Sequence, residues 1–421
     1  MYKGIPVSLF NLVLSMSDAL DLASPELQQH QIRTAYIALE LARQSGMNKQ
    51  DIENLVIASL IHDIGALTPE EKIDLHEADT VETEPHCALG EQLLKGLPVF
   101  LAASRIVRLH HHSWQDLMLS VQMPVTAQAQ MLALADQVER MIDHSRYILH
   151  QRAEIMTRVE ALADREIETD LVNNFKEIAQ REDFWLTITS PRLYSLLLHD
   201  SPTSGTVLDM YDLRIVSEMF RNLIDFRSRF TSTHSAGVST SAALIAKYFG
   251  LTMREIELCE IAGNLHDLGK LMVPNSILEK QDKLTVQEFE IMKQHSYFTY
   301  MILNSVKGLE EIAEWAAFHH EKLNGNGYPF HIKARKLNVI SRILAVADIF
   351  TALAEDRPYR PGMDMAAAMA IIKKMGDDGM LDQKIISVLE GNLDDIVDET
   401  KRKQARTREY YEKVFEYKGK Q

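Results

Sequence analysis

Apolar residues recur along most of the chain with a spacing near 3.6 residues, which is the period of an α-helix. The clearest such runs are Ile32–Ser45, Lys49–Ile61, Ala242–Phe249, Met253–Leu265 and Val339–Leu353. Glycines follow two of these runs, at Gly46 and Gly250, where a residue with positive φ commonly ends a helix. Alternating patterns typical of strands are short and weak. The pattern therefore predicts an all-α protein.

The length of 421 residues exceeds what one hydrophobic core usually holds. The stretch Thr187–Thr206 is rich in Ser, Thr, Pro and Gly, as domain junctions often are. We therefore expect two domains, comprising residues 1–200 and 201–421.

The composition is that of a globular protein, with 46% apolar and 25% charged residues. The net charge of −15 argues against a DNA-binding protein, which usually carries a basic face. It does not exclude a small anionic substrate, because metal ions reverse the sign of the charge locally.

The cysteine content, the N-terminal segment and the lengths of the apolar runs predict a cytoplasmic protein. Two distant cysteines, Cys87 and Cys259, cannot form a disulfide framework, which fits a reducing compartment. The segment Met1–Met16 is apolar but interrupted by polar residues, so we interpret it as a docked amphipathic helix and not as a signal peptide. No apolar run reaches the 18 residues that a membrane-spanning helix needs.

The chain contains an internal repeat of chemistry. The order His, His-Asp, His, His-His, Asp occurs once in each half, and the first step, from His30 to His62 and from His234 to His266, is 32 residues in both. The first set is His30, His62, Asp63, His86, His111, His112 and Asp136. The second set is His234, His266, Asp267, His295, His319, His320 and Asp348. In the first half the pair His110-His111 would fit equally well. The repeat predicts a duplicated helical domain.

These residue types point to metal binding. Neutral imidazoles and carboxylates are suitable ligands for iron, manganese or zinc. Asp348 lies in RILAVADIFTAL, a segment apolar almost all round and therefore buried as a helix. Burying a carboxylate without a partner costs on the order of several kcal/mol, so a cation should lie beside it.

Several segments of the second half identify a family. NLHDLGK, KLTVQEFEIMKQH, HHEKLNGNGYP, ISRILAVADIF and EDRPYRP together closely resemble the HD-GYP branch of the HD phosphohydrolases, over about residues 220–390. The resemblance implies two tandem HD-type helical bundle domains, of which the second is the catalytic HD-GYP domain. It also implies hydrolysis of a cyclic dinucleotide to a linear 5′-phosphorylated dinucleotide, in bacterial second-messenger signalling.

The resemblance further implies the parts of the site. The seven residues of the second set would hold two divalent ions, with iron or manganese expected, and Asp267 would bridge them. Lys270 is similar to the family's catalytic lysine, as a cation or a general acid. Tyr328, Arg357 and Arg360 would contact substrate, although Tyr328 could simply shape its turn. Phe230 stands where some relatives have a Glu that holds a third metal, so two ions are expected.

Other departures affect the substrate lip. His331-Ile332-Lys333-Ala334 and Leu323-Asn324 replace the usual residues around GNGYP, which leaves the base preference open. Cyclic di-GMP is the family's default substrate. The tandem arrangement is similar to that of 3′3′-cyclic GMP-AMP phosphodiesterases, which makes 3′3′-cyclic GMP-AMP (cGAMP) the other candidate.

The first half keeps the ligand types but lacks the rest. Ala66 replaces the lysine, and no GYP segment follows the histidine pair. This half is either a further metal site, acting on a smaller phosphate ester such as the 5′-phosphate of the product, or a scaffold.

Two alternatives for the whole protein remain: a nucleotide phosphomonoesterase of the wider HD superfamily, and a non-catalytic signalling adaptor that binds the nucleotide. Retention of Lys270 argues against the adaptor, and GNGYP against the plain nucleotidase. Signalling protein partners or a homodimer are possible partners besides the substrate.

Overall fold

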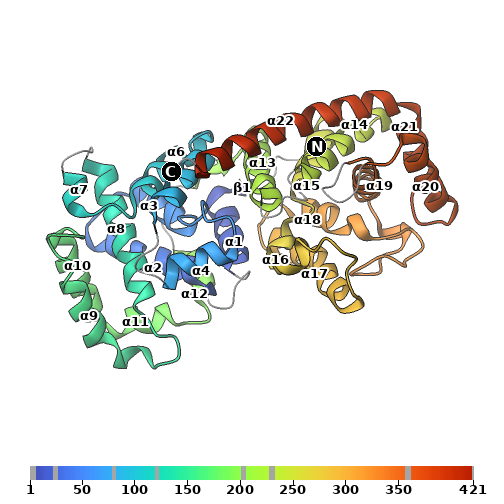
Figure 1. Cartoon of the computed structure of the whole chain (residues 1–421). Helices are drawn as coiled ribbons and strands as arrows, with labels where there is room; N and C mark the ends of the chain where they lie inside the picture. The colour runs from blue at the N-terminus through green and yellow to red at the C-terminus, as the bar shows by residue number, and fades with distance from the viewer. Residues whose placement is uncertain are drawn as a thin grey trace. The chain divides into compact units, whose positions relative to one another are not determined.

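The computed structural model describes residues 6–21, 27–77, 82–118, 123–200, 205–226, 233–355 and 362–419. Within these residues the protein is built from helices, joined by short loops, and has one two-stranded sheet, β1 (Val7–Ser8) paired with β2 (Val207–Leu208) (Figure 1). The all-α prediction is confirmed. No described helix is long and apolar enough to cross a membrane.

The chain divides into two compact units, Ser8–Val207 and Leu208–Lys420, the latter taken together with Met1–Val7. The helices of the first unit are α1 (Leu9–Asp21), α2 (His30–Gln44), α3 (Lys49–Leu60), α4 (Pro69–Glu77), α5 (Glu84–Leu94), α6 (Leu101–Leu109), α7 (Trp114–Met118), α8 (Met123–Arg140), α9 (Arg152–Glu160), α10 (Thr169–Ala179), α11 (Glu182–Ile188) and α12 (Leu193–Asp200).

The helices of the second unit are α13 (Met210–Phe226), α14 (His234–Phe249), α15 (Met253–Leu265), α16 (Asn275–Leu278), α17 (Val286–Asn304), α18 (Glu310–Ala317), α19 (Val339–Ala354), α20 (Met365–Asp377), α21 (Gln383–Gly391) and α22 (Leu393–Gly419). Short 3-10 turns at Leu268–Met272 and Phe318–His320 interrupt this bundle at two of the expected ligand positions.

The expected helix ends agree with the structure. Gly250 ends α14 with a φ of 91°, and Gly46 follows α2 with a φ of 66°. Thr252 begins α15 with a reciprocal capping box, in which its side chain accepts from the backbone of Glu255. These local signals fix where α14 and α15 turn back on each other, and this is the most extensive helix pair of the second unit.

The expected amphipathic helix at the N-terminus is a core helix instead. Ten of the 13 residues of α1 are buried, including Ser15, Ser17 and Asp21. Gln31 donates its backbone N–H to Asp21 at 2.9 Å, and its side-chain amide lies 3.2 Å from the hydroxyl of Ser17. Because α2 satisfies these polar groups, α1 can be buried on nearly all sides.

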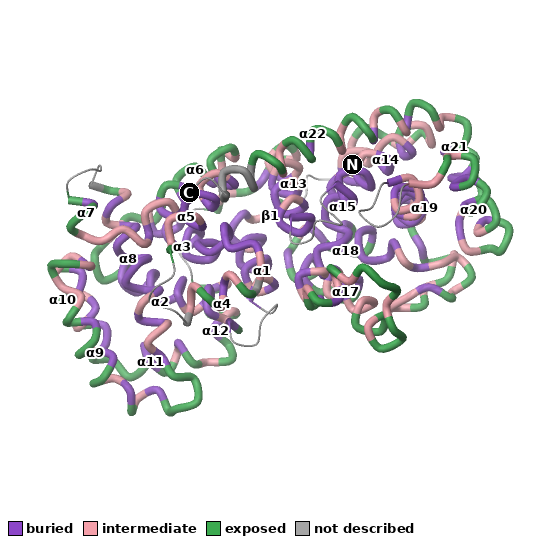
Figure 2. Tube along the Cα trace, in the orientation of Figure 1, coloured by how far each residue is buried: buried purple, intermediate pink, exposed green. Residues whose placement is uncertain are grey.

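In both units the buried faces of the helices turn inward and the exposed faces turn outward (Figure 2). The helices that carry the expected ligands, α2 and α3 in the first unit and α14, α15 and α19 in the second, are among the most buried. Each unit therefore surrounds its His/Asp set with its own hydrophobic core.

Candidate functional site

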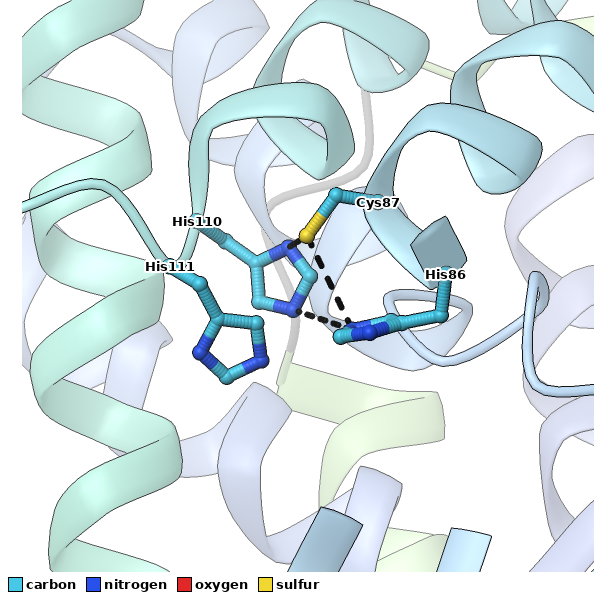
Figure 3. A group of neighbouring side chains, drawn as sticks. All are labelled: His86, Cys87, His110 and His111. Atoms are coloured by element: carbon cyan, nitrogen blue, oxygen red, sulfur yellow. Dashed lines mark hydrogen bonds between the residues drawn. The ribbon is translucent and has the colours of Figure 1, made fainter. Parts of the chain in front are cut away.

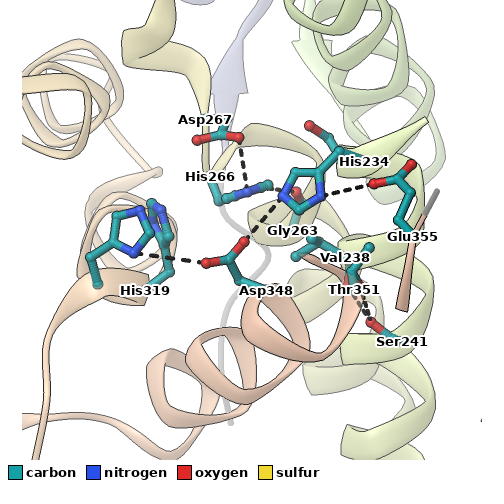
Figure 4. A network of polar contacts seen from close by, with 12 residues as sticks. His234, Val238, Ser241, Gly263, His266, Asp267, His319, Asp348, Thr351 and Glu355 are labelled. Carbon is teal, nitrogen blue, oxygen red and sulfur yellow. Dashed lines mark hydrogen bonds and ion pairs between the residues drawn. The ribbon is translucent and has the colours of Figure 1, made fainter. Parts of the chain in front are cut away.

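The second unit brings the seven expected metal ligands together in one cluster. Figure 4 shows His234, His266, Asp267, His319 and Asp348 of this cluster. His234 is the first residue of α14, His266 and Asp267 follow α15, and His295 lies within α17. The remaining ligands are the pair His319-His320 in the 3-10 turn after α18, and Asp348 in the middle of α19. Five segments that are distant in sequence thus converge on one point.

A glycine sets how closely two of these segments approach. A Cβ on Gly269 would lie 1.9 Å from the backbone oxygen of His295 and 2.7 Å from the backbone nitrogen of Thr299. The first half repeats this contact, because a Cβ on Gly65 would lie 2.0 Å from the backbone oxygen of His86. In both halves the glycine two residues after the aspartate lets the His-Asp turn pack directly against the next ligand helix.

Backbone carbonyls fix the ring orientation of three histidines. The Nδ1 atoms of His266, His295 and His319 lie 2.8, 2.7 and 2.6 Å from carbonyl oxygens three residues earlier. Nδ1 is therefore assigned as the protonated nitrogen, and Nε2 carries the lone pair. Such a carbonyl contact is typical of metal-ligating histidines.

These lone pairs face one another. The Nε2 atoms of His295 and His319 are 3.3 Å apart, and Nε2 of His266 is buried with no hydrogen-bond partner in the described part of the chain. Two acceptors at this distance repel, unless a cation lies between them. Two imidazole nitrogens on one zinc ion are separated by about 3.3 Å, given Zn–N bonds of about 2.0–2.1 Å. The residues therefore fit a bound metal.

Two carboxylates, Asp348 and Glu355, flank His234 and favour positive charge in the cluster. His234 lies 3.1 Å from Asp348 and 3.3 Å from Glu355. Burial opposes a charge on His234, but its hydrogen bonds to these carboxylates raise its pKa to about 10. Burial lowers the pKa of His320 to about 3. His320 is therefore neutral beside ionised carboxylates, as a metal ligand must be, whereas the carboxylates around His234 stabilise a positive charge that a metal ion would supply in place of the proton.

Lys270 lies at the edge of the cluster. Its Nζ donates to Oδ2 of Asp267 at 2.5 Å, while the other oxygen of Asp267 is 3.5 Å from Nε2 of His295. Although burial raises the pKa of Asp267, the charges of His266 and Lys270 hold it well below its usual range. Lys270 thus adjoins the carboxylate expected to bridge two ions.

Tyr328 lies beside the ligands, with its ring centroid 4.8 Å from that of His320. Glu321 holds the following loop, because it accepts backbone hydrogen bonds from Phe330 at 2.7 Å and Ile332 at 3.0 Å. A Cβ on Gly327 would lie 2.4 Å from the Cα of Glu321. The GNGYP segment is therefore clamped against the histidine pair. Arg357 and Arg360, and also Phe230, lie outside the described residues.

The first unit assembles a second cluster from its own ligand set. Nε2 of His30 lies 3.3 Å from Nε2 of His62, 3.4 Å from Asp136 and 3.8 Å from Asp63. Nε2 of His86 lies 3.7 Å from Asp63. Ala66, at the position of Lys270, is buried and apolar.

The histidine pair of this cluster is His110-His111, not the expected His111-His112. Nδ1 of His110 lies 2.7 Å from the Val107 oxygen, as His319 lies against Ala316. The rings of His110 and His111 are 4.1 Å apart, against 4.0 Å for His319 and His320. One ligand atom from each of His86, Cys87, His110 and His111 lies within 4.8 Å of the others, and His112 is not in this group.

A buried glutamate contacts the first histidine of each cluster. The sequence pattern did not predict either glutamate. Glu139 accepts from Nδ1 of His30 at 2.6 Å, and Glu355 lies 3.3 Å from Nδ1 of His234. Each orients the first histidine of its set from behind, which raises the basicity of the ligand nitrogen. Glu139 follows Asp136 by three residues on α8, and that helical spacing was the only available hint.

His76 is a further member of the first cluster without a counterpart in the second set. Its ring lies 4.9 Å from that of His30, and a ligand atom of His76 groups with those of His30 and Glu139. It comes from α4. The first cluster is therefore not a simple copy of the second.

The fold and the paired His/Asp clusters define a helical protein of the HD class. HD-domain models match residues 218–385 and residues 27–141. The chain therefore belongs to the HD-domain family and carries the domain twice.

The chain matches known proteins over most of its length or over one part of it. The chain is 27% identical to 3′3′-cGAMP-specific phosphodiesterase 1 of Vibrio cholerae over 396 residues, which cover 92% of both chains. It is 37% identical to the cyclic di-GMP phosphodiesterase response regulator RpfG of Xanthomonas campestris over 151 residues, 35% of this chain and 40% of that protein. A crystal structure of a cyclic GMP-AMP specific phosphodiesterase of V. cholerae, V-cGAP3, matches with a TM-score of 0.65 at 20% identity, covering 92% of this chain and 98% of that chain. At that identity the match shows the fold, and it agrees with two tandem HD domains.

Proposed function

We propose that this protein is a metal-dependent phosphodiesterase that hydrolyses a cyclic dinucleotide to a linear 5′-phosphorylated dinucleotide. The observation that carries this proposal is the cluster of seven ligands in the second unit, with Lys270 against Asp267 and Tyr328 against His320. The chain matches a 3′3′-cGAMP-specific phosphodiesterase over 92% of both chains and a cyclic di-GMP phosphodiesterase over 35% of its own length. Both matches support a cyclic dinucleotide as the substrate.

The ligand assignment follows the geometry. His234, His266, Asp267, His295, His319, His320 and Asp348 would hold two divalent ions, iron or manganese. When bound, such ions supply a hydroxide near neutral pH and neutralise charge on the phosphate. The nitrogens that face one another, His295 and His319, are oriented by carbonyls before any ion arrives. The chain therefore offers a preorganised site.

In the reaction, the oxygen of water adds to phosphorus and the bond to the 3′-oxygen breaks. The 3′-oxygen takes up a proton, and the phosphate stays on the 5′-oxygen. The ammonium group of Lys270 lies beside Asp267, where it can offset negative charge on the phosphate or deliver that proton. Tyr328 lies where it can contact a phosphate or base next to His320.

For the base preference, we propose 3′3′-cyclic GMP-AMP ahead of cyclic di-GMP. The relative named for 3′3′-cGAMP matches over 92% of both chains, whereas the cyclic di-GMP enzyme RpfG matches 35% of this one. The first unit is thus shared with the cGAMP enzyme, beyond the catalytic domain alone.

The deciding experiment is product analysis. Full-length protein loaded with iron or manganese is incubated with 3′3′-cyclic GMP-AMP, cyclic di-GMP and cyclic di-AMP, and the products are separated by chromatography. We expect the linear 5′-phosphorylated dinucleotide, formed fastest from 3′3′-cyclic GMP-AMP. Release of inorganic phosphate from mononucleotides, with every ring left intact, would favour a phosphomonoesterase instead.

The first unit favours a second proposal: its cluster also holds at least one metal ion. His62 directs Nδ1 to the carbonyl of Ser59 at 2.9 Å, and His30 directs Nδ1 to Glu139, so their Nε2 atoms face each other at 3.3 Å, where a proton or a metal ion can lie between them. Burial opposes the charge on His30, but Glu139 and Asp136 raise its pKa well above the usual value. This part of the protein thus attracts a cation as the second unit does.

A further inference from the structure

The cluster of the first unit contains a thiol. Consecutive residues of α5, His86 and Cys87, present an imidazole and a sulfur toward His110 and His111 at the end of α6 (Figure 3). Sγ of Cys87 lies 3.7 Å from Nε2 of His86 and 3.6 Å from Nδ1 of His110. The side chain of Cys87 is buried, so it faces the cluster and not solvent.

The second unit has oxygen at the same place. Ser296 follows His295 in α17 as Cys87 follows His86 in α5, and its hydroxyl lies 3.1 Å from Nε2 of His295. The two clusters share the His-Asp turn, the histidine pair and the glycine contact. They differ in having sulfur or oxygen beside the third histidine.

The donor spacing in the first unit suits one ion. The Nε2 atoms of His86 and His110 are 3.5 Å apart, and the Sγ–Nε2 separation at His86 is 3.7 Å. Ligands of one tetrahedral zinc ion are separated by about 3.3 Å between two nitrogens and about 3.6 Å between nitrogen and sulfur, given bonds of about 2.0–2.1 and 2.3 Å.

A second observation points to a missing ligand. Nδ1 of His86 is buried and has no hydrogen-bond partner within the described ranges, whereas its counterpart in His295 lies 2.7 Å from the oxygen of Met292. The residue as a whole is 5% exposed. A buried imidazole whose Nδ1 is unpaired and whose Nε2 faces another histidine is stabilised when an ion binds the lone pair of Nε2, because the ion compensates for the missing hydrogen bonds.

We propose that Cys87 is a metal ligand and that the first unit binds zinc through sulfur and imidazole, unlike the nitrogen and oxygen site of the second unit. This inference rests on the proposed metal binding by the first unit. Thiolate sulfur favours zinc over manganese, which prefers oxygen ligands. On binding, the S–H bond of Cys87 breaks, the proton leaves to water and a sulfur–zinc bond forms, so no oxidant or reductant takes part.

The test uses cobalt(II), which replaces zinc and absorbs in the near ultraviolet when a thiolate is bound. Metal-free full-length protein is titrated with cobalt(II), and the thiolate-to-cobalt band is recorded. We expect the band in the wild type, its loss in Cys87→Ser and Cys87→Ala, and its retention in Cys259→Ser. Cys259 is the matched control, because it is a buried cysteine of α15 in the other unit.

Zinc affinity gives a second readout. Losing even an outer partner of a metal ligand costs about 10–100-fold in affinity, so Cys87→Ser should weaken zinc binding by at least about tenfold in a competition with a chelator dye. Far-ultraviolet circular dichroism establishes that each variant remains folded.

The outcomes separate the two proposals. Metal content that is equal in the wild type and in a His62→Ala/His86→Ala variant, which removes a ligand from each donor group, would refute metal binding by the first unit altogether. Metal binding that is lost in that variant, with no thiolate band in the wild type, would refute only the role of Cys87. A band that survives Cys87→Ser would also overturn it.

Discussion

At the scale of residues, the second unit contains the proposed metal ligands, Lys270 beside Asp267, and Glu355 behind His234. Lys270 donates to Asp267 and is not one of the seven expected ligands. Glu355 touches His234 on the side away from Asp348. These two residues should therefore have separable effects on turnover and on metal affinity.

Lys270→Ala is expected to leave the metal content nearly intact and to lower turnover by about 10²–10³-fold, the scale of losing one group that stabilises charge in the transition state. Elemental analysis and steady-state rates on the same preparation measure both quantities. Lys373→Ala, which removes an exposed ion pair with Glu390, is the control. A parallel loss of metal would mean that Lys270 is structural.

Asp267→Ala is expected to remove metal and activity together, since Asp267 lies against His266, His295 and Lys270. Asp282→Ala, an exposed position of the same unit, is the control. Full turnover by folded Asp267→Ala protein would contradict the assigned centre.

Glu355→Gln is expected to weaken metal binding by about 10–100-fold, because it removes the charge behind His234 while keeping the shape of the side chain. Competition with a chelator of known affinity measures the change. An unaltered affinity would reduce Glu355 to a packing residue.

Much of the site could be predicted because ligand types in a fixed order are rare in a core. The spacing could not separate His110-His111 from His111-His112, since that choice depends on where α6 ends. Glu139 and Glu355 look in sequence like any surface acid, and Cys87 like any core cysteine. Only the structure shows what each of them faces.

At the scale of elements, each cluster depends on a tight turn laid against the next ligand helix. The helices themselves follow from apolar periodicity, and α15 was predicted to the residue. The 3-10 turns that carry Lys270 and the pair His319-His320 were not predicted, because such turns arise from packing and not from a repeating pattern.

Gly269→Ala tests this packing. The added methyl would meet the backbone of α17 at 1.9 Å, which cannot move away as a side chain can. We expect a loss of about 1–3 kcal/mol, typical of overpacking, together with reduced metal binding. Gly391→Ala is the control, because a Cβ there meets nothing within 4 Å. Thermal unfolding of both variants provides the measurement, and equal melting temperatures would refute the contact.

At the scale of the whole molecule, one arrangement of His and Asp residues occurs twice, and the residues around it differ between the two units. The second unit has Lys270 and a clamped GNGYP loop, while the first has Ala66, His76 and Cys87. We infer that duplication preserved the framework while the chemistry around it diverged.

The metal stoichiometry follows from this division. Full-length protein with His62→Ala and His86→Ala should retain two ions, those of the second unit, because Phe230 cannot supply the Glu of a three-metal site. The wild type should hold at least one more. Elemental analysis of both proteins decides this, and three ions in the double variant would be inconsistent with a two-metal centre.

The contact between His234 and Asp348 joins residues 114 positions apart in the sequence. An ion shared by such residues acts as a reversible staple across a long loop, and it removes conformations from the unfolded chain as a disulfide does. Complete unfolding of the metal-bound second unit then requires the ion to dissociate from these residues. The lifetime of the folded second unit should therefore follow the residence time of its ions, and unfolding rates measured with and without chelator would reveal that dependence.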